Sequence, residues 1–400
     1  MKRVYLDYAA TSPLDGRALA AMMPYLTDEF GNADSVHSFG RRAADAVDTA
    51  RRRIASAIGA ARQEIYFTSG GTEANNWAVK GVAHALGRTG KKRVITTAIE
   101  HPSVLAAARS LERYGFDVAI LPVSAGGVLG IETLRGALGA DTALVSVMTA
   151  NNEAGTVQPV RELAALAHEY GALFHTDAVQ AAGHADVDVS ASGVDLMTVS
   201  AHKFGGPKGA GFLYIKKGVL PDKLIEGGHQ ERSMRGGTTN VPGVVGMAEA
   251  LRLAVAKLDE NAAYISSLRD RFIARVQKEI PFVNLNGHPK NRLPSNANFS
   301  FRYVEGESLL FSLDLAGIAV SSGSACSSGS LEPSHVLLAT GMSEGLAHGS
   351  LRFSFGRENT AEDVDYTVDK LKEIVVKLRN LSPLFPKDMK NEVNITTSST

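Results

Sequence analysis

Between residues 64 and 215, short apolar segments alternate with amphipathic ones, and this pattern leaves few folds open. Several of the apolar segments are β-branched and apolar on both faces, as in a parallel sheet covered by helices on both sides. The predicted strands are Glu64–Thr68, Arg93–Ala98, Asp117–Pro122, Ala143–Thr149, Ala172–Asp177, Asp195–Ala201 and Gly211–Ile215. The predicted helices are Thr72–Leu86, Ser103–Tyr114, Ile131–Leu138 and Val160–Glu169. The alternation predicts an open α/β domain with a mostly parallel sheet.

The rest of the chain predicts a second, smaller α+β domain. An extended arm covers residues 4–11, a helix 39–58, and a long helical stretch 244–279. Beyond these lie predicted strands Asn296–Phe301 and Ser350–Ser354 and helices Glu307–Leu315, Pro333–Ala339 and Ala361–Arg379. We therefore expect a large domain over 15–257 and a small one built from 1–14 and 258–382. The polar tail 383–400 is expected to be disordered.

Composition narrows the class of protein. Lys+Arg and Asp+Glu both number 42, so the zero net charge gives no support to nucleic-acid or anionic-membrane binding. No apolar run approaches the roughly 18 residues that a membrane helix needs. The single cysteine excludes an intrachain disulfide and fits a reducing compartment, so the cytoplasm is the expected location. No metal site within the chain is expected.

Polar residues gather where five of the predicted strands end. These groups are Ser69-Gly70-Gly71-Thr72, Glu100-His101, Asn151-Asn152-Glu153, His175-Thr176-Asp177 with Gln180, and Ser200-Ala201-His202-Lys203. Ligands of open α/β sheets bind beyond the carboxyl ends of the strands. The five groups together therefore predict one binding site at this edge.

The residue types suggest the ligand. The Ser-Gly-Gly-Thr turn at a helix N-terminus offers backbone N–H groups and a dipole to a phosphate, although alone it reads equally as a plain helix cap. It lacks the patterns of a nucleotide-binding or dinucleotide-binding loop. Asp177 could keep a heterocyclic nitrogen protonated, and Lys203 could form a Schiff base. Together these features predict a pyridoxal 5'-phosphate site.

Four segments carry a family resemblance, namely residues 68–76, 175–180, 200–209 and 321–329. They resemble the cysteine desulfurases of the NifS/IscS type, which are class V, fold-type I pyridoxal phosphate enzymes. The likeness extends from Tyr5 to Ser354. It implies a large, open, mostly parallel sheet domain with a smaller α+β domain, and a homodimer.

The resemblance also implies residue roles. Lys203 would bind the cofactor covalently and move the Cα proton, and His101 would stack on the ring and assist proton transfers. The cofactor would further be held by Asp177 at the ring nitrogen, Gln180 at the phenolic oxygen, Gly71, Thr72, Ser200 and His202 at the phosphate, and Thr238 from the neighbouring subunit. Arg352 would clamp the substrate carboxylate, and Asn152 would contact cofactor or substrate.

Cys326 is implied as the sulfur acceptor in the conversion of L-cysteine to L-alanine. Every other residue of 321–329 is Ser, Gly or Ala, so no apolar face exists for a core position. This composition also predicts a mobile loop that can carry sulfur to an acceptor. The resemblance implies that the acceptor is an iron-sulfur scaffold protein or another sulfur acceptor, with transient contact between Cys326 and a cluster during transfer.

Two alternatives stay open. One is another class V pyridoxal phosphate enzyme, such as a selenocysteine lyase or an aminotransferase. Transamination needs no thiol, so Cys326 argues against the latter. The other is a non-catalytic scaffold with the same fold, which should have lost Lys203 or Cys326, yet both are present.

Overall fold

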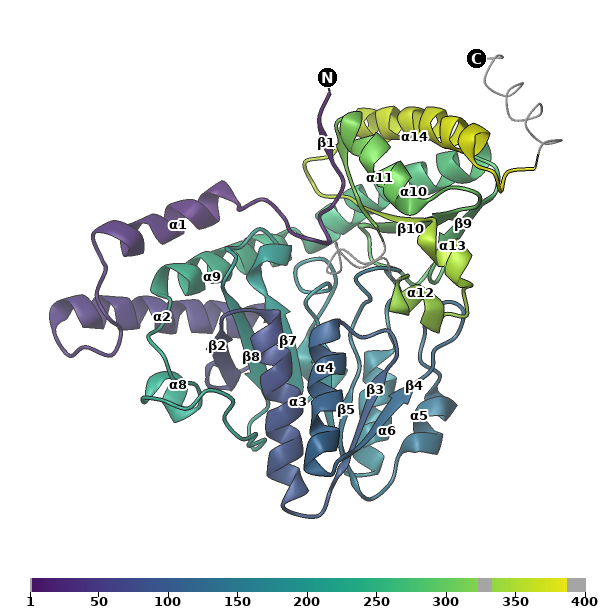
Figure 1. Cartoon of the computed structure of the whole chain (residues 1–400). Helices are drawn as coiled ribbons and strands as arrows, with labels where there is room; N and C mark the ends of the chain where they lie inside the picture. The colour runs from purple at the N-terminus through teal and green to yellow at the C-terminus, as the bar shows by residue number, and fades with distance from the viewer. Residues whose placement is uncertain (1, 323–332, 387–400) are drawn as a thin grey trace.

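A seven-stranded sheet forms the centre of the larger part of the molecule (Figure 1), in a computed structural model that describes residues 2–322 and 333–386. In sheet order the strands are β2 (Ile65–Thr68), β8 (Gly211–Ile215), β7 (Leu196–Ser200), β6 (Leu173–Asp177), β5 (Thr142–Ser146), β3 (Arg93–Thr97) and β4 (Asp117–Leu121). Only β8 runs antiparallel to its neighbours β2 and β7. The predicted mostly parallel sheet is therefore confirmed.

Helices cover both faces of this sheet, as the strand composition requires. Val94 and Leu144 pack on one face with α3 (Gly71–Gly87) and α4 (Pro102–Ser110). Their neighbours Ile95 and Val145 point to the other face, because successive strand residues alternate sides. That face is covered by α2 (Ser38–Ala57), α6 (Val160–Glu169) and α9 (Val241–Ala256).

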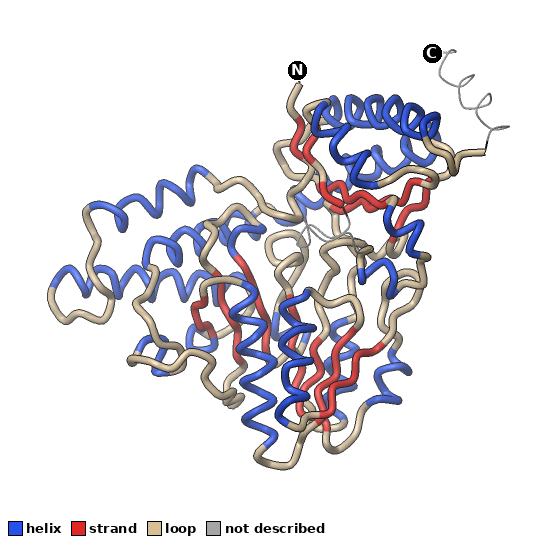
Figure 2. Tube along the Cα trace, viewed as in Figure 1, coloured by secondary structure: helices blue, strands red, loops and turns tan. Residues whose placement is uncertain are grey.

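A second, antiparallel sheet forms the smaller part, which lies above the large sheet in Figures 1 and 2. Its strand order is β12 (Ser321–Ser322), β13 (Ser350–Ser354), β10 (Asn296–Phe301) and β9 (Val283–Asn286). Helices α10 (Leu258–Glu279), α11 (Gly306–Leu315) and α14 (Ala361–Leu381) pack with it. The arm strand β1 (Val4–Tyr5) pairs in parallel with β11 (Ile318–Ala319).

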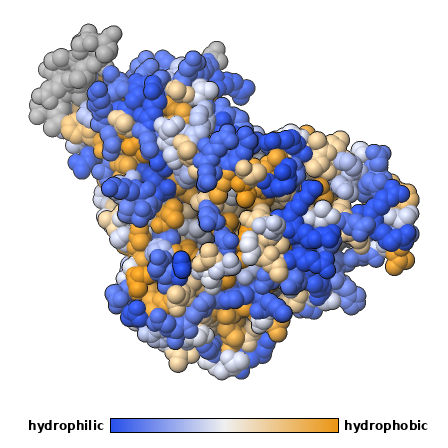
Figure 3. Space-filling view, turned by 180° about the vertical axis from the view of Figure 1, so that it is seen from behind, coloured by the Kyte–Doolittle hydropathy of each residue, from blue (hydrophilic) through white to orange (hydrophobic). Residues whose placement is uncertain are grey.

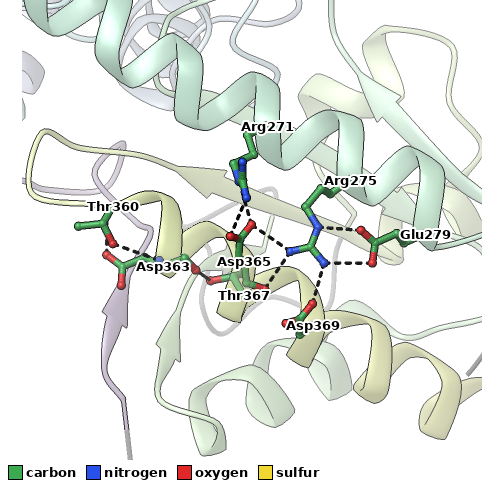
Figure 4. Close-up of polar contacts among 8 residues, drawn as sticks. All are labelled: Arg271, Arg275, Glu279, Thr360, Asp363, Asp365, Thr367 and Asp369. Atoms are coloured by element: carbon green, nitrogen blue, oxygen red, sulfur yellow. Dashed lines mark hydrogen bonds and ion pairs between the residues drawn. The ribbon is translucent and has the colours of Figure 1, made fainter. Parts of the chain in front are cut away.

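An ion-pair cluster joins α10 to α14 (Figure 4). Arg275 donates to Asp369 at 2.7 Å and to Asp365 at 3.1 Å across the two helices, and to Glu279 within α10 at 2.7 Å. Arg271 donates two hydrogen bonds to the carboxylate of Asp365, one to each oxygen. These contacts fix the register of the two helices over the smaller sheet.

The predicted helical stretch 244–279 is wrong as a single helix. It is two helices, α9 and α10, separated at Lys257, whose backbone leaves the helical region (φ −125°, ψ 24°). No glycine or proline marks the break, so the local residue pattern held no signal for it. Most other boundaries move by one to three residues, and the predicted helix Ser103–Tyr114 ends as α4 followed by a 3₁₀ turn over Leu111–Tyr114.

Helix α1 (Gly16–Thr27) was not predicted, and Pro24 inside it obscures the pattern. The remaining elements are α5 (Ile131–Ala137), α7 (Val189–Ser192), α8 (Gln230–Ser233), α12 (His335–Ala339), α13 (Glu344–His348) and 3₁₀ turns at Arg62–Glu64 and Ala201–Lys203.

We propose the domain division expected above, with a large domain over 15–257 and a small one built from 1–14 and 258–382. It is supported by one core built from residues 4–6 and 265–375 and two confined to 18–254. A small fourth core joins the two parts, where Val336 packs with Ile99, Met148 and Ala154.

Seen from behind, hydrophilic residues cover most of the surface and hydrophobic ones lie in scattered patches (Figure 3). Within residues 2–322 and 333–386, no helix is both long enough and apolar enough to cross a membrane.

Candidate active site

Asp177 and Lys203 stand at the ends of neighbouring parallel strands. Asp177 is the last residue of β6, and Lys203 closes the 3₁₀ turn that follows β7. The two charges act on the same imidazole: at His101, Asp177 raises the pKa and Lys203 lowers it. The three residues that the sequence singled out for cofactor chemistry are therefore brought together.

The Asp177 carboxylate is buried and held by neutral donors. Its Oδ2 accepts from Asn75 Nδ2 at 2.7 Å, and its Oδ1 accepts from the Val179 backbone at 2.9 Å. Oδ1 of Asn75 is itself buried with no hydrogen-bond partner among the described residues. Neither of these two donors is charged, so a cationic ligand group could supply the counter-charge that burial of a carboxylate requires.

The Lys203 amine is held by the N-terminal arm. Its Nζ donates to the carbonyl oxygens of Ala9 at 2.7 Å and Ala10 at 2.8 Å. Gln180 Nε2 donates to the same Ala9 oxygen at 3.0 Å, and His202 Nδ1 lies 3.2 Å from Thr11 Oγ1. Thus the arm contacts three of the predicted cofactor residues at once.

His101 caps the N-terminus of α4. Its Nδ1 accepts from the Ser103 backbone at 3.2 Å and lies 2.8 Å from Ser103 Oγ, so the proton of the neutral ring belongs on Nε2. Burial lowers the pKa of His101, and Asp177 only partly opposes this shift. The ring is therefore neutral at physiological pH.

The turn before α3 forms a cradle against β7. Gly70 has φ 152°, a conformation that favours glycine, and a Cβ on Gly71 would come within 2.9 Å of Val179 Cγ2 and 3.6 Å of Ser200 Cβ. Thr72 follows in the first turn of α3, whose N–H groups have no acceptor within the helix. Burial, with the Lys203 and Lys208 charges, lowers the pKa of His202 to about 4, so it offers a neutral ring beside this turn.

Arg352 lies on β13 of the smaller sheet and is only 1% exposed. Its Nη1 donates to the backbone oxygen of Asn152 at 2.9 Å, and its Nη2 donates to Asp7 Oδ1 at 2.8 Å. The predicted substrate residues Arg352 and Asn152 are thus neighbours, the first on a strand of the smaller sheet and the second in the loop between β5 and α6 of the larger part.

Two predicted site residues stand apart. Thr238 is exposed and lines a cavity of about 130 Å³ with Thr68, Ser69 and Arg235. Cys326 lies outside the described residues. Both described flanks of its segment are at the site: Ser321 pairs directly with Arg352, and His335 Nε2 lies 3.0 Å from the Glu100 backbone oxygen.

Sequence reasoning missed the residues that support these side chains. Asn75, Ser103 and Asp7 link Asp177, His101 and Arg352 to their surroundings. Asn75 lies in the segment 68–76 and Asp7 in the arm 4–11, both of which stand out in the sequence because of other residues. Their positions therefore suggested that they are near the site, but their residue types did not indicate which side chains they contact. The acceptors of Lys203 are backbone oxygens, which leave no mark in a sequence.

The arrangement fits pyridoxal phosphate. The turn at the N-terminus of α3 can bind its phosphate, and the buried carboxylate of Asp177 can pair with its protonated ring nitrogen. The amine of Lys203, after the end of β7, can bond to its aldehyde. Among the described residues, no cluster of three or more His, Cys, Asp and Glu side chains could hold a metal ion.

Known proteins resemble this chain over nearly its whole length. The family model described as "Aminotransferase class-V" matches residues 4–367. A curated relative named "Cysteine desulfurase IscS" from Dictyoglomus turgidum is 54% identical over 96% of this chain and 97% of its own length. One of the same name from Methanosarcina thermophila is 51% identical, covering 97% and 95%. A solved structure titled "NIFS-LIKE PROTEIN" superposes with a TM-score of 0.88 at 38% identity, covering 94% and 99%.

Proposed function

The chain belongs to the class-V aminotransferase family and is a pyridoxal-phosphate-dependent cysteine desulfurase, and we propose that it converts L-cysteine to L-alanine through a persulfide on Cys326. The observation that carries the proposal is the convergence of Asp177 and Lys203 on His101 at adjoining strand ends.

The cofactor would be held by the residues gathered at the sheet edge. Lys203 would bind it covalently, Asp177 would pair with the ring nitrogen, Gln180 would contact the phenolic oxygen, and His101 would lie on the ring. Its phosphate would be held by Gly71, Thr72, Ser200 and His202. When bound, pyridoxal phosphate supplies an electron sink for the substrate Cα.

Lys203 Nζ is the base that we assign to the Cα proton. In the structure it donates to Ala9 and Ala10, so the arm limits the directions in which the amine can reach. The lowered pKa of His101 keeps its ring neutral, and Ser103 occupies Nδ1, so Nε2 is the ring atom left to assist proton transfer. A neutral ring adds no second positive charge beside Lys203.

Arg352 would bind the substrate carboxylate, with Asn152 beside it. The Cys326 thiolate would attack the substrate sulfur, forming an S–S bond as the substrate Cβ–S bond breaks. The electron pair of that bond stays on carbon, which takes up a proton and leaves as L-alanine. The net change is a thiol on the enzyme becoming a persulfide and a C–S bond becoming C–H.

We also propose the assembly and destination of the sulfur. The enzyme would be a cytoplasmic homodimer in which Thr238 of each subunit reaches the phosphate held by the other. Its exposed position supports a role outside its own subunit. The persulfide would pass to an iron-sulfur scaffold protein or another acceptor, with Cys326 meeting the cluster only transiently.

Replacing the only thiol tests the reaction. Cys326→Ser should bind the cofactor and exchange the Cα proton, but release no alanine, because a hydroxyl is a very poor nucleophile toward sulfur. Wild type treated with cysteine should gain one sulfur on the Cys326 peptide by mass spectrometry, and Ser328→Ala serves as the control on the same segment. A serine variant that makes alanine at the wild-type rate would favour the lyase or aminotransferase alternatives. A wild type without any turnover would favour the scaffold.

A further inference from the structure

The guanidinium of Arg352 is buried and already has a carboxylate partner. Its side chain is 2% exposed, and Asp7, at 17%, accepts from Nη2 at 2.8 Å. The Asn152 backbone oxygen takes one N–H of Nη1. Among the described residues, Nε is buried and has no hydrogen-bond partner. Of the five N–H groups of the guanidinium, one is thus bound by Asp7 and one by Asn152, and the Nε N–H is among those left without a partner within the described part of the chain.

Asp7 supplies the negative charge that this burial requires. Arginine keeps its proton in proteins, and an unpaired buried charge is strongly unfavourable. The other nearby carboxyl is Glu153, which acts electrostatically on Arg352 and whose pKa burial raises to about 7. Ser334 also donates a hydrogen bond to Glu153. Asp7 is therefore the carboxylate that hydrogen-bonds Arg352 directly, whereas Glu153 acts on it only through space.

The position of Asp7 is fixed by the backbone on both sides of it. The Leu6 N–H donates to the Ala319 oxygen at 2.8 Å, and the Leu6 oxygen accepts from the Ser354 N–H at 2.7 Å. The Ala9 N–H donates to Ser354 Oγ at 2.9 Å. The Tyr5 hydroxyl donates to the Asp7 backbone oxygen at 3.1 Å. Asp7 is therefore held at Arg352 by the fold of the arm, not by a chance surface contact.

We propose that Asp7 is a positioning residue, a resident carboxylate that holds Arg352 and balances its charge until the α-carboxylate of the amino-acid ligand replaces it. This inference rests on the proposed function, because it takes Arg352 as the carboxylate site. An amine without a carboxylate cannot take the place of Asp7. Asp7 therefore weakens the binding of every amino acid at Arg352, whereas the binding of an amine without a carboxylate does not depend on it.

The test compares two ligands on the holoenzyme, followed by the change in cofactor absorbance. L-Alanine carries the carboxylate, and ethylamine lacks it. In Asp7→Asn the amide oxygen still accepts from Arg352, but the competing charge is gone. The alanine dissociation constant should fall roughly tenfold, the low end for one charged hydrogen bond, while that of ethylamine stays the same. Asp365→Asn, an arginine-paired aspartate between α10 and α14, is the matched control and should change neither constant.

Asp7→Ser provides a second, smaller neutral side chain and should shift the alanine constant in the same direction. Unchanged or weaker alanine binding in both variants would overturn the proposal. Loss of the fold in both, seen by melting, would also overturn it, because Asp7 would then be a structural counter-ion only. Alanine release from cysteine by wild type is measured separately, so a failure of the proposed reaction is distinguishable from a failure of the role of Asp7.

Discussion

At the scale of single residues, the site depends on charges held in place by neutral neighbours. Lys203 is the clearest case, because its amine meets two backbone oxygens and acts on His101. Lys203→Ala should abolish turnover and leave the cofactor bound without a covalent link. Borohydride should fix the cofactor to wild type and to Lys208→Ala, whose lysine lies exposed in the next turn. Fixation to the Lys203 variant would contradict the assignment.

Glu100, beside His101, is a buried carboxyl that makes stability depend on pH. Burial raises its pKa to about 8 from 4.5, against hydrogen bonds from Thr97 and Met148. Above pH 4.5 Glu100 ionises in the unfolded chain, while the folded protein keeps the proton. The free energy of unfolding therefore decreases as the pH rises from 4.5 toward 8. A difference of one in the pKa between the folded and the unfolded chain corresponds to about 1.4 kcal/mol in the free energy of unfolding.

Glu100→Gln should therefore stabilise the protein relative to wild type, and more at pH 8 than at pH 5.5. Thermal melting across this range measures the difference between the two proteins. Exposed Glu112→Gln is the control and should follow wild type at every pH. A constant offset between Glu100→Gln and wild type would mean that Glu100 ionises normally.

At the scale of elements, an unusual turn at α8 lies between strand β8 and the loop that carries Thr238. Glu231, Arg232 and Ser233 all have positive φ (45°, 57° and 63°), which costs each non-glycine residue about 1–2 kcal/mol. Glu231 is buried, accepts two hydrogen bonds from Arg51 at 2.7 Å, and accepts from the Phe67 backbone at 2.9 Å. These contacts with α2 and β2 hold the turn in its strained conformation.

Loss of the ion pair between Glu231 and Arg51 should lower the free energy of unfolding substantially. Glu231→Gln leaves Arg51 without its counter-ion, and loss of one partner of a buried pair typically costs about 3–5 kcal/mol. Urea unfolding should show a clearly lower midpoint. Asp48→Asn removes the exposed partner of Arg52 and Arg62 on α2 and should cost about 1 kcal/mol or less. Equal midpoints for the two variants would show that Glu231 contributes no more than a surface contact.

At the scale of the whole molecule, α1 and the segment after it project to one side of the sheet (Figure 1) and expose large apolar side chains. These are Leu19, Met23, Leu26, Phe30, Val36 and Phe39. Phe30 is 70% exposed, and its ring lies tilted by 33° against that of Phe39, with the ring centroids 5.6 Å apart. We propose that the second copy of the homodimer covers this side, since such a cluster is costly in water.

Leu26→Asp with Phe30→Asp should therefore lower the mass found by light scattering from that of two chains to that of one. Leu384→Asp, an exposed leucine in the smaller part of the molecule, is the control and should leave the mass unchanged. A wild-type protein that elutes as a single chain would refute the dimer and, with it, the role of Thr238 across subunits.

The sequence by itself determined the α/β class, the mostly parallel sheet and the strand ends at which Asp177 and Lys203 stand. These features follow from local patterns, because side-chain periodicity and the direction of parallel strands are properties of short segments. The prediction failed at Lys257, where the helix breaks without a glycine or proline, and at α1, where Pro24 conceals a helix.

Only the tertiary structure decided what holds the site residues. Asp7 meets Arg352 across 345 positions of sequence, and Ala9 meets Lys203 across 194. Such contacts form because the arm pairs with β11 and β13 of the smaller part of the molecule while lying over the edge of the large sheet. No local pattern encodes them, since backbone oxygens are identical in every residue and a carboxylate finds its partner only once the chain has folded.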